Sequence, residues 1–332
     1  MDGGVGALPA GPGPAERGML VRLMDPEQRS NRDPYHLDQR SVRRAFERAA
    51  AAYDSAAVLD REIGQRMAER LALVKLQPAA ILDAGCGTAE GLAELRTRFP
   101  GTAIVGLDIA FAMLTAARQR LSVIAAERRK LARLFVAGGP AARGALVCAD
   151  FRRLPFAAGA FDLVWSNLAL QWINDPPVAF AEFRRVLRPG GLLMFTTFGP
   201  DTLAELRAAF AAVDRAPHVS RFADMHDLGD MLLDAGFAEP VMDMEKLTLT
   251  YADAHALMRD LKATGARNAT AGRRRGLTGR RRWGRLIEAL EAFRRDGRLP
   301  ATFEVVYGHA WKPEARAAAD GRAIIRLHRP PR

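Results

Sequence analysis

The feature that most constrains this chain is an alternation of short apolar segments with helical segments between residues 80 and 198. Each apolar segment is four to seven residues long, which is typical of a strand rather than a helix. Strands that alternate with helices form a parallel sheet covered on both faces. The pattern therefore predicts an α/β fold whose strands occupy Ala80–Ala84, Ala103–Leu107, Leu146–Ala149, Phe161–Ser166 and Leu192–Phe198.

Helices are also predicted before the first strand and after the fourth. Apolar residues recur at helical spacing from Ser41 to Val74, which predicts two helices, or one broken helix, before the first strand. A further helix is predicted at Pro177–Leu187, and Arg188-Pro189-Gly190-Gly191 after it predicts a turn. Two later strands are predicted at Val241–Leu249 and Phe303–Tyr307.

The length of 332 residues suits one large domain, or one domain with a subdomain. Glycine, proline and charge without periodicity predict disorder at the N-terminus. An insertion at 120–145, expected to be a helix and a loop, interrupts the core. The expected units are a disordered tail at 1–34, N-terminal helices at 35–78, the α/β core at 79–200, a cap and C-terminal part of the same domain at 201–315, and a tail at 316–332.

Cysteine content and hydropathy limit the cellular compartments in which this protein is expected. Cys86 and Cys148 are the only cysteines, too few for a disulfide framework or a cysteine-rich metal site. No apolar run approaches the roughly 20 residues that a membrane helix needs. The N-terminus lacks the basic and apolar regions of a secretory signal. We therefore expect a cytoplasmic protein that does not associate with a membrane.

The charge balance is basic, with 49 Lys plus Arg against 38 Asp plus Glu, a net charge of +11. Much of the excess is local, because seven arginines and no acid lie between Gly272 and Arg285. Such a stretch is either a solvated basic loop or a docking face for an acidic partner, and charge alone leaves both readings open.

A glycine-rich turn, Asp83-Ala84-Gly85-Cys86-Gly87, follows the first predicted strand. Glycines at this place let backbone N–H groups and a helix N-terminus approach a ligand closely. The spacing is not the Gly-x-Gly-x-x-Gly of a dinucleotide fold. Because Asp83 precedes the glycines, the turn suits a ligand with a cationic part better than a phosphate.

Acidic residues also end the second and third strands. Asp108 lies 21 residues after Gly87 and can accept hydrogen bonds from ribose hydroxyls. Asp150 can accept from an adenine amino group, and Phe151 can pack beside the ring. A single acid at a strand end is usually a helix cap, but three in series favour a nucleoside-containing cofactor.

These motifs resemble those of the class I methyltransferase family. Asp83-Ala84-Gly85-Cys86-Gly87-Thr88 is similar to its first motif, Asp108 to its second and Asp150 to its third. The resemblance implies a Rossmann-like α/β fold and S-adenosyl-L-methionine (SAM) as cofactor. One departure is Ala89, where many members have another glycine.

A closer resemblance covers about Arg40 to Trp311 and points to the malonyl-acyl carrier protein O-methyltransferases of biotin synthesis. In that family the free carboxylate of malonyl-acyl carrier protein is methylated. The segments that carry the resemblance are Phe46–Ala50, Tyr53-Asp54, Trp165–Trp172, Phe195–Gly199, Arg221-Phe222 and Leu261–Ala266.

The resemblance also implies site residues. The substrate clamp carries over to Tyr53 and Arg221, which by themselves would be read as a core tyrosine and a surface arginine. No general base or metal is expected, because a carboxylate is already a nucleophile at neutral pH. The expected cofactor-binding residues are Asp83, Gly85, Cys86, Gly87, Asp108, Ile109, Asp150, Phe151 and Asn167.

The expected partner is malonyl-acyl carrier protein, an acidic protein that Arg267–Arg298 could dock. Two alternatives stay open. Complex I assembly factors share the cofactor core and a stretch similar to Gly199–Leu203, but hydroxylate an arginine of a partner protein. A non-catalytic RNA-associated protein is the second alternative. Nucleic acid is not expected, because the basic stretch lacks interleaved aromatic residues and no RNA-binding module is recognisable.

Overall fold

The computed structural model describes residues 33–132 and 145–314. The predicted tails over residues 1–32 and 316–332 lie outside this part of the chain, and so does most of the loop predicted within the insertion. The helical part of the insertion is the second half of α7 (Phe111–Ala132), a single helix of 22 residues that begins in the core.

A seven-stranded sheet in the order β3-β2-β1-β4-β5-β7-β6 organises the fold. The first five strands in this order are parallel, and β7 and β6 extend the sheet in antiparallel pairing. This confirms the predicted α/β fold with a mostly parallel sheet. The strands are β1 (Ala80–Ala84), β2 (Ala103–Asp108), β3 (Ala145–Cys148), β4 (Phe161–Ser166), β5 (Leu187–Phe198), β6 (Ala238–Tyr251) and β7 (Leu299–Trp311).

The turn predicted at Arg188–Gly191 is instead the first part of β5. The Gly190 N–H donates to the Lys312 carbonyl, and the Lys312 N–H donates to the Gly191 carbonyl. Pairing with Lys312, the residue just after β7, therefore overrides the local turn signal, and Gly190 supplies the positive φ of 73° that this irregular start needs.

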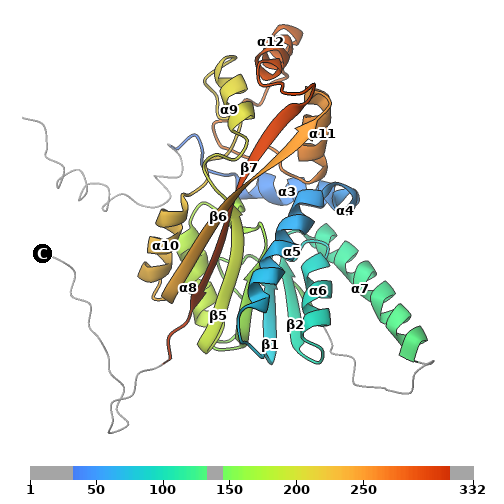
Figure 1. Ribbon diagram of the computed structural model, residues 1–332, viewed down its shortest axis with the longest axis vertical. Helices are drawn as coiled ribbons and strands as arrows, with labels where there is room; N and C mark the ends of the chain where they lie inside the picture. Colours follow the sequence, from blue (N-terminus) through green and yellow to red (C-terminus); the bar gives the residue numbers. More distant parts are fainter. Residues whose placement is uncertain (1–32, 133–144, 315–332) are drawn as a thin grey trace, which may run out of the picture.

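Helices cover both faces of the sheet (Figure 1). On one face, α5 (Val58–Ala72), α6 (Glu90–Arg98) and α7 pack on side chains such as Ile81 and Leu163. On the other face, α8 (Pro176–Val186) and α10 (Met225–Asp234) pack on Leu82 and Val164. Neighbouring residues of one strand thus serve opposite cores, as the two-residue period of a strand requires.

A helical cap stands beyond the carboxyl ends of the parallel strands, at the top of Figure 1. It contains α9 (Ala204–Ala211), α11 (Ala254–Ala263) and α12 (Arg280–Glu291), with Leu206, Leu286 and Leu290 in a small core of its own. Beneath it lie α3 (Gln39–Ala49) and α4 (Tyr53–Ala56). The short η1 (Leu170–Trp172) contacts α3 through Trp172 and Phe46, whose ring centroids are 5.2 Å apart. The cap and the N-terminal helices thereby enclose the edge of the sheet where ligands of open α/β folds bind.

Within the described ranges, no helix is long and apolar enough to span a bilayer.

Gly308→Ala is expected to lower the free energy of unfolding by about 1–3 kcal/mol, the usual cost of overpacking. Gly308 pairs with Phe195 across β5 and β7, and a Cβ there would lie 2.4–3.0 Å from three ring atoms of this fully buried side chain. Gly276→Ala is the control, because a Cβ at Gly276 meets nothing within 4 Å. Urea unfolding should separate the two variants, and an equal stability would contradict this packing.

Candidate functional site

The glycine-rich turn is tied to the end of the second strand. The N–H groups of Gly85 and Cys86 both donate to the carbonyl oxygen of Leu107, at 2.7 and 2.9 Å. Gly85 has a φ of +85°, and a Cβ there would come within 2.4 Å of the Ala169 Cβ. A side chain is therefore excluded at Gly85 both by backbone conformation and by the segment that follows β4.

Asp83 ends up as a buried carboxyl with no hydrogen-bond partner among the described residues. Its side chain is 3% exposed, and burial, followed by repulsion from Asp108, raises its pKa to about 8. Asp83 lines a cavity whose wall also contains Trp165, and the indole Nε1 of Trp165 is likewise buried without a hydrogen-bond partner. An acceptor and a donor left unpaired in one cavity fit a polar ligand, and the carboxylate fits a cationic group of that ligand.

Asp108 links the first motif to the second. One carboxylate oxygen accepts from the Gly87 N–H at 3.0 Å, and the other accepts from the Ala110 N–H at 2.8 Å. Burial raises the pKa of Asp108 to about 6, although these backbone hydrogen bonds oppose the rise. Each oxygen keeps a lone pair, so the group can still accept hydrogen bonds from a ligand.

Asp150 is held by a residue that the sequence analysis did not single out. Arg152 Nε and Nη2 donate to Asp150 Oδ2 at 3.0 and 2.6 Å. Partial burial works to raise the pKa of Asp150, but the hydrogen bonds from Arg152 outweigh it and lower the pKa. Phe151 lines a second cavity, next to Asp108, and packs on Phe183 with ring centroids 5.7 Å apart. The carboxylate can therefore offer a ligand only the lone pairs that Arg152 leaves.

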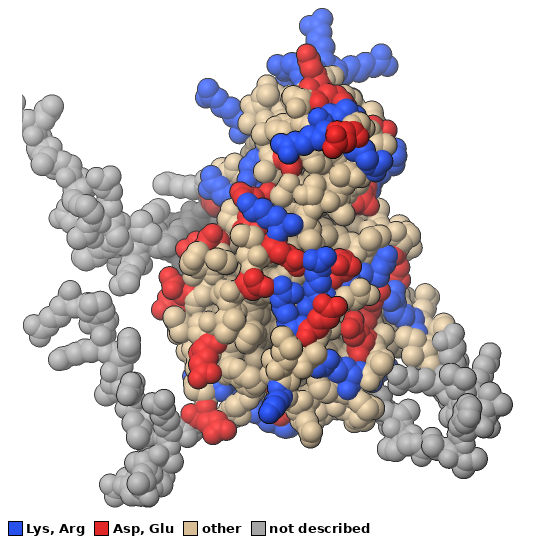
Figure 2. Space-filling view, viewed as in Figure 1, with Lys and Arg blue, Asp and Glu red and all other residues tan. Residues whose placement is uncertain are grey.

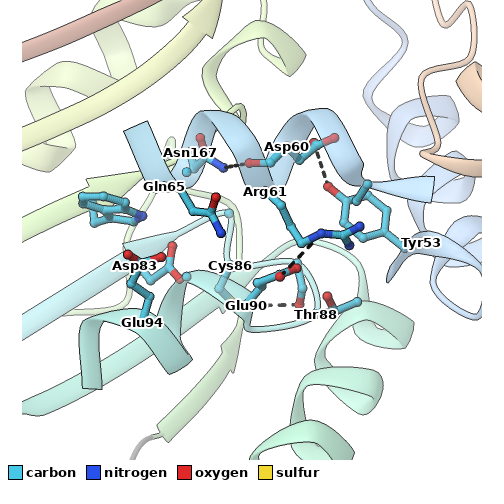
Figure 3. A pocket seen from close by; sticks show the side chains of 16 residues that line it. Tyr53, Asp60, Arg61, Gln65, Asp83, Cys86, Thr88, Glu90, Glu94 and Asn167 are labelled. Atoms are coloured by element: carbon cyan, nitrogen blue, oxygen red, sulfur yellow. Dashed lines mark hydrogen bonds and ion pairs between the residues drawn. The ribbon is translucent and has the colours of Figure 1, made fainter. Parts of the chain in front are cut away.

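A hydrogen-bonded set joins the N-terminal helices to the core. The Tyr53 hydroxyl donates to Asp60 Oδ1 at 3.0 Å. Asn167 Nδ2 donates to the Asp60 carbonyl at 2.9 Å, and Asn167 Oδ1 accepts from Thr196 Oγ1 at 2.7 Å. Figure 3 shows Tyr53 and Asn167 meeting Asp60 from opposite sides. Burial and the Asp60 carboxylate raise the pKa of Tyr53 well above its usual value, so its hydroxyl keeps its proton.

Three cavities meet at Tyr53. The Asp83 cavity contains Asp83, Cys86 and Trp165 in its wall, and the Asp108 cavity contains Asp108, Ile109, Asp150 and Phe151 in its wall. Gly85, Gly87 and Asn167 line both. The third, here called the Phe198 cavity, has a mostly apolar wall that also contains polar and acidic side chains. Its lining includes Phe46, Leu59, Leu168, Phe198, Leu249 and Phe303 together with Asp60, Gln171, Asp260 and Thr264, and Tyr53 lines all three cavities. The structure thus brings all nine expected cofactor-binding residues together around Tyr53.

Arg221 is not brought to this place. Its side chain is exposed, its guanidinium carbon lies 3.8 Å from the centroid of the Tyr35 ring, and it lines none of the three cavities. Its predicted role in a clamp with Tyr53 stays a prediction.

Sequence reasoning missed three polar residues of α5 that line the Asp83 cavity: Asp60, Arg61 and Gln65. Figure 3 shows them on one side of the cavity, with Asp83 and Cys86 on the other. Arg61 Nη1 donates to the Asp54 carbonyl at 2.6 Å, and its Nε lies 3.8 Å from Glu90 Oε1. A partial signal was the spacing of Arg61 and Gln65, which lie four residues apart and therefore on one face of the helix.

Cys86 contributes space rather than reactivity. Burial, and then the carboxyls of Asp83 and Asp108, raise the pKa of its thiol well above the usual value. The group therefore stays a thiol rather than the nucleophilic thiolate. Among the described residues, no three His, Cys, Asp or Glu side chains are grouped so as to hold a metal ion.

Comparisons with known proteins show which proteins the chain is similar to. A family model described as a methyltransferase domain matches residues 82–195. A malonyl-acyl carrier protein O-methyltransferase from Gallionella capsiferriformans is 56% identical over 290 residues, which cover 87% of this chain and 96% of that protein. A protein of the same name from Laribacter hongkongensis is 55% identical over 299 residues, covering 89% and 98%. These names give no support to the hydroxylase or RNA-binding alternatives.

Solved structures agree on the fold. The YcgJ protein from Bacillus subtilis is 16% identical and superposes with a TM-score of 0.50, covering 75% of this chain and 98% of that chain. At this identity the likeness concerns the fold alone.

Asp83→Asn is expected to stabilise the ligand-free protein, increasingly so as the pH rises. The folded carboxyl has a pKa of about 8, and an unfolded aspartate has one of about 3.9. Folding thus favours the protonated form, so the wild-type protein loses stability as the pH rises from about 4 to about 8. The asparagine variant lacks this loss, and each unit of pKa difference is worth about 1.4 kcal/mol.

Urea unfolding at about pH 5 and about pH 8.5 measures this effect. Asp230→Asn, at an exposed position of α10, is the matched control and should change stability little at either pH. A stability gain for Asp83→Asn that is the same at both pH values would contradict the assignment.

Proposed function

The chain belongs to the family of malonyl-acyl carrier protein O-methyltransferases, and on this premise we propose that it methylates the free carboxylate of malonyl-acyl carrier protein, with SAM as the methyl donor. The observation that carries the proposal is the meeting of three cavities at Tyr53, because it joins two cavities that contain Asp83, Asp108 and Asp150 in their walls to a third cavity with a mostly apolar wall. The methyl ester masks the charge of the malonyl group, which allows elongation towards the pimeloyl chain of biotin.

The Asp83 and Asp108 cavities divide the cofactor between them. Asp83 is the partner for the ammonium group of the methionine part, and Arg61 in the opposite wall of the Asp83 cavity is the cation for its carboxylate. Asp108 accepts from the ribose hydroxyls, and Phe151 packs beside the adenine in the Asp108 cavity. This placement pairs Asp83 with a positive charge, which offsets the desolvation that the carboxylate otherwise suffers.

The chemistry asks the protein for position rather than for a base. When bound, SAM would supply an electrophilic methyl group on a sulfonium, which a substrate carboxylate oxygen would attack in line with the C–S bond, with the neutral thioether of S-adenosylhomocysteine as the leaving group. Tyr53 stands where the cofactor cavities meet the Phe198 cavity, so its hydroxyl can give up its hydrogen bond to Asp60 and donate its one proton to the incoming carboxylate instead. Before the substrate enters, Asp60 orients the Tyr53 hydroxyl, and Asn167 donates to the backbone carbonyl of Asp60. Such fixed orientation is a large part of the rate gain in two-substrate reactions.

The carrier protein is proposed to dock on Arg267–Arg298, which contains eleven arginines and three acids. Arg280, Arg281 and Arg285 of α12 are exposed and make no ion pair within the described part of the chain. Figure 2 shows basic side chains projecting at the top of the molecule, where Figure 1 places α12. Such a face suits an acidic partner. Both cysteines are free thiols, in keeping with a cytoplasmic location.

The direct test of this function is methyl transfer by the purified protein. Malonyl-acyl carrier protein and SAM are expected to give a base-labile methyl ester, detected by mass spectrometry of the carrier protein. Acetyl-acyl carrier protein is the control, because it lacks the free carboxylate. Transfer to neither substrate, or equally to both, would refute the proposed reaction.

Tyr53→Phe is expected to lower kcat/KM for malonyl-acyl carrier protein about 10- to 100-fold and to leave SAM affinity nearly unchanged. A hydrogen bond to a charged group is worth about 1.5–3 kcal/mol, which corresponds to this range of rates. Tyr35→Phe is the matched control, because it removes a hydroxyl and keeps the ring beneath Arg221. Methyl transfer and calorimetric SAM binding are measured for both.

Arg221 is tested beside Tyr53. If Arg221 completes the clamp, Arg221→Ala should abolish methyl transfer with SAM binding intact, and Arg221→Lys should restore part of it, since an ammonium cannot make two parallel hydrogen bonds. Near-normal turnover of Arg221→Ala would leave Tyr53 as the clamp without Arg221.

A further inference from the structure

A basic groove crosses the cap. It is bounded by α9, α11, α12 and the segment between α11 and α12, and is called the cap groove here. Its cationic residues are Lys262, Arg267, Arg273, Arg274 and Arg282.

Three of these cations are uncommitted. Arg273 donates to Ser41 Oγ at 2.9 Å, and Arg282 lies 3.9 Å from Asp214 Oδ2. Lys262, Arg267 and Arg274 make no ion pair with any carboxylate in residues 33–132 and 145–314. Arg267 is half-buried, so it holds a partly desolvated positive charge without a counter-charge. Such a charge favours an anionic ligand.

The cap groove shares part of its wall with the Phe198 cavity. Leu261 and Ala266 line both the cap groove and the Phe198 cavity. Tyr53 in turn lines the Phe198 cavity and both cofactor cavities. Shared wall residues therefore place the cap groove, the Phe198 cavity and the cofactor cavities next to one another in this order, with uncommitted cations at one end and Tyr53 at the other. The Phe198 cavity between them has a mostly apolar wall that also contains Asp60 and Asp260.

The order of chemistry along these cavities matches one kind of substrate arm. A carrier protein presents its acyl group on 4′-phosphopantetheine, which has a phosphodiester at its base, a largely uncharged stem and a thioester at its tip. The cations of the cap groove match the phosphodiester, and the Phe198 cavity matches the uncharged stem. The malonyl group at the tip then reaches Tyr53.

We propose that the cap groove is the phosphate subsite of this enzyme, in which Arg267, Lys262 and Arg274 bind the phosphodiester of 4′-phosphopantetheine while the stem lies in the Phe198 cavity. The subsite rests on the proposed function, since it assumes a malonyl thioester as substrate. It is distinct from protein–protein docking, because it recognises the prosthetic group even without the carrier. An arginine can hold a phosphate with two parallel hydrogen bonds, and a lysine adds a mobile charge.

The test compares two small substrates that differ only in the phosphate, malonyl-pantetheine and malonyl-4′-phosphopantetheine. The wild-type enzyme should use the phosphorylated substrate with the higher kcat/KM. Arg267→Gln should lower kcat/KM for it about 10- to 100-fold, the range for a lost charged hydrogen bond. The same variant should leave kcat/KM for malonyl-pantetheine and the affinity for SAM unchanged.

Arg274 and its neighbour give a matched pair of variants. Arg274→Gln removes a charge that lines the cap groove, and Arg275→Gln removes an exposed charge that does not. Only the first should affect the phosphorylated substrate. Calorimetry with 4′-phosphopantetheine itself gives a readout without turnover. The Arg267→Gln variant should bind this compound more weakly than the wild-type enzyme does.

The outcomes separate the two proposals. If the wild-type enzyme methylates no malonyl thioester, carrier-bound substrate included, the proposed function fails. If it methylates malonyl-acyl carrier protein but treats the two small substrates alike, only the phosphate subsite fails. Equal losses on both small substrates in Arg267→Gln would show that Arg267 supports the fold of the cap rather than a phosphate.

Discussion

The site depends on how the first two strands of the core end. The turn after β1 gives two N–H groups to one carbonyl oxygen of β2, and the carboxylate of Asp108 takes a third N–H from Gly87. These bonds hold the turn open at the carboxyl edge of the sheet, with Ala169 packed where a Gly85 side chain would stand. Residues of this turn line the Asp83 and Asp108 cavities, and Tyr53, which packs beside the turn, lines these two cavities and the Phe198 cavity.

The same arrangement concentrates negative charge in a place from which water is largely excluded. Burial raises the pKa of both Asp83 and Asp108. The charge of Asp108 raises the pKa of Asp83 further, and both carboxyls raise the pKa of the Cys86 thiol. An arrangement of this kind destabilises the ligand-free protein and becomes favourable when a cation enters. Arg61 of α5 adds a positive group to the wall of the same cavity. The pairing of acid and base across one cavity is what a ligand with both an ammonium and a carboxylate requires.

Substrate access is a matter of the parts added to the core. Tyr53 comes from the N-terminal helices, whereas Leu261 and Arg267 come from the cap. The N-terminal helices are tied to the segment after β4 by the hydrogen bonds from Asn167 to the Asp60 carbonyl and from Gln39 to the Trp172 carbonyl, and by the contact of Phe46 with Trp172. On the proposed function, the core serves the cofactor and the elements placed over it serve the acyl group and its carrier, which is consistent with one cofactor site being used with many acceptors.

By itself, the sequence determined the five parallel strands to within a few residues and singled out nine of the residues that line the Asp83 and Asp108 cavities. The reason is that both rest on local information: strand period and length, and acids placed where strands end. Local information failed at Arg188–Gly191, where pairing with the distant Lys312 turned a predicted turn into strand. It also could not show that Arg152 holds Asp150, that α5 lines the Asp83 cavity, or that Arg221 lies over Tyr35. Only the tertiary structure decided these, and the joining of the cap groove to Tyr53, because side chains far apart in the chain meet through packing that no local period records.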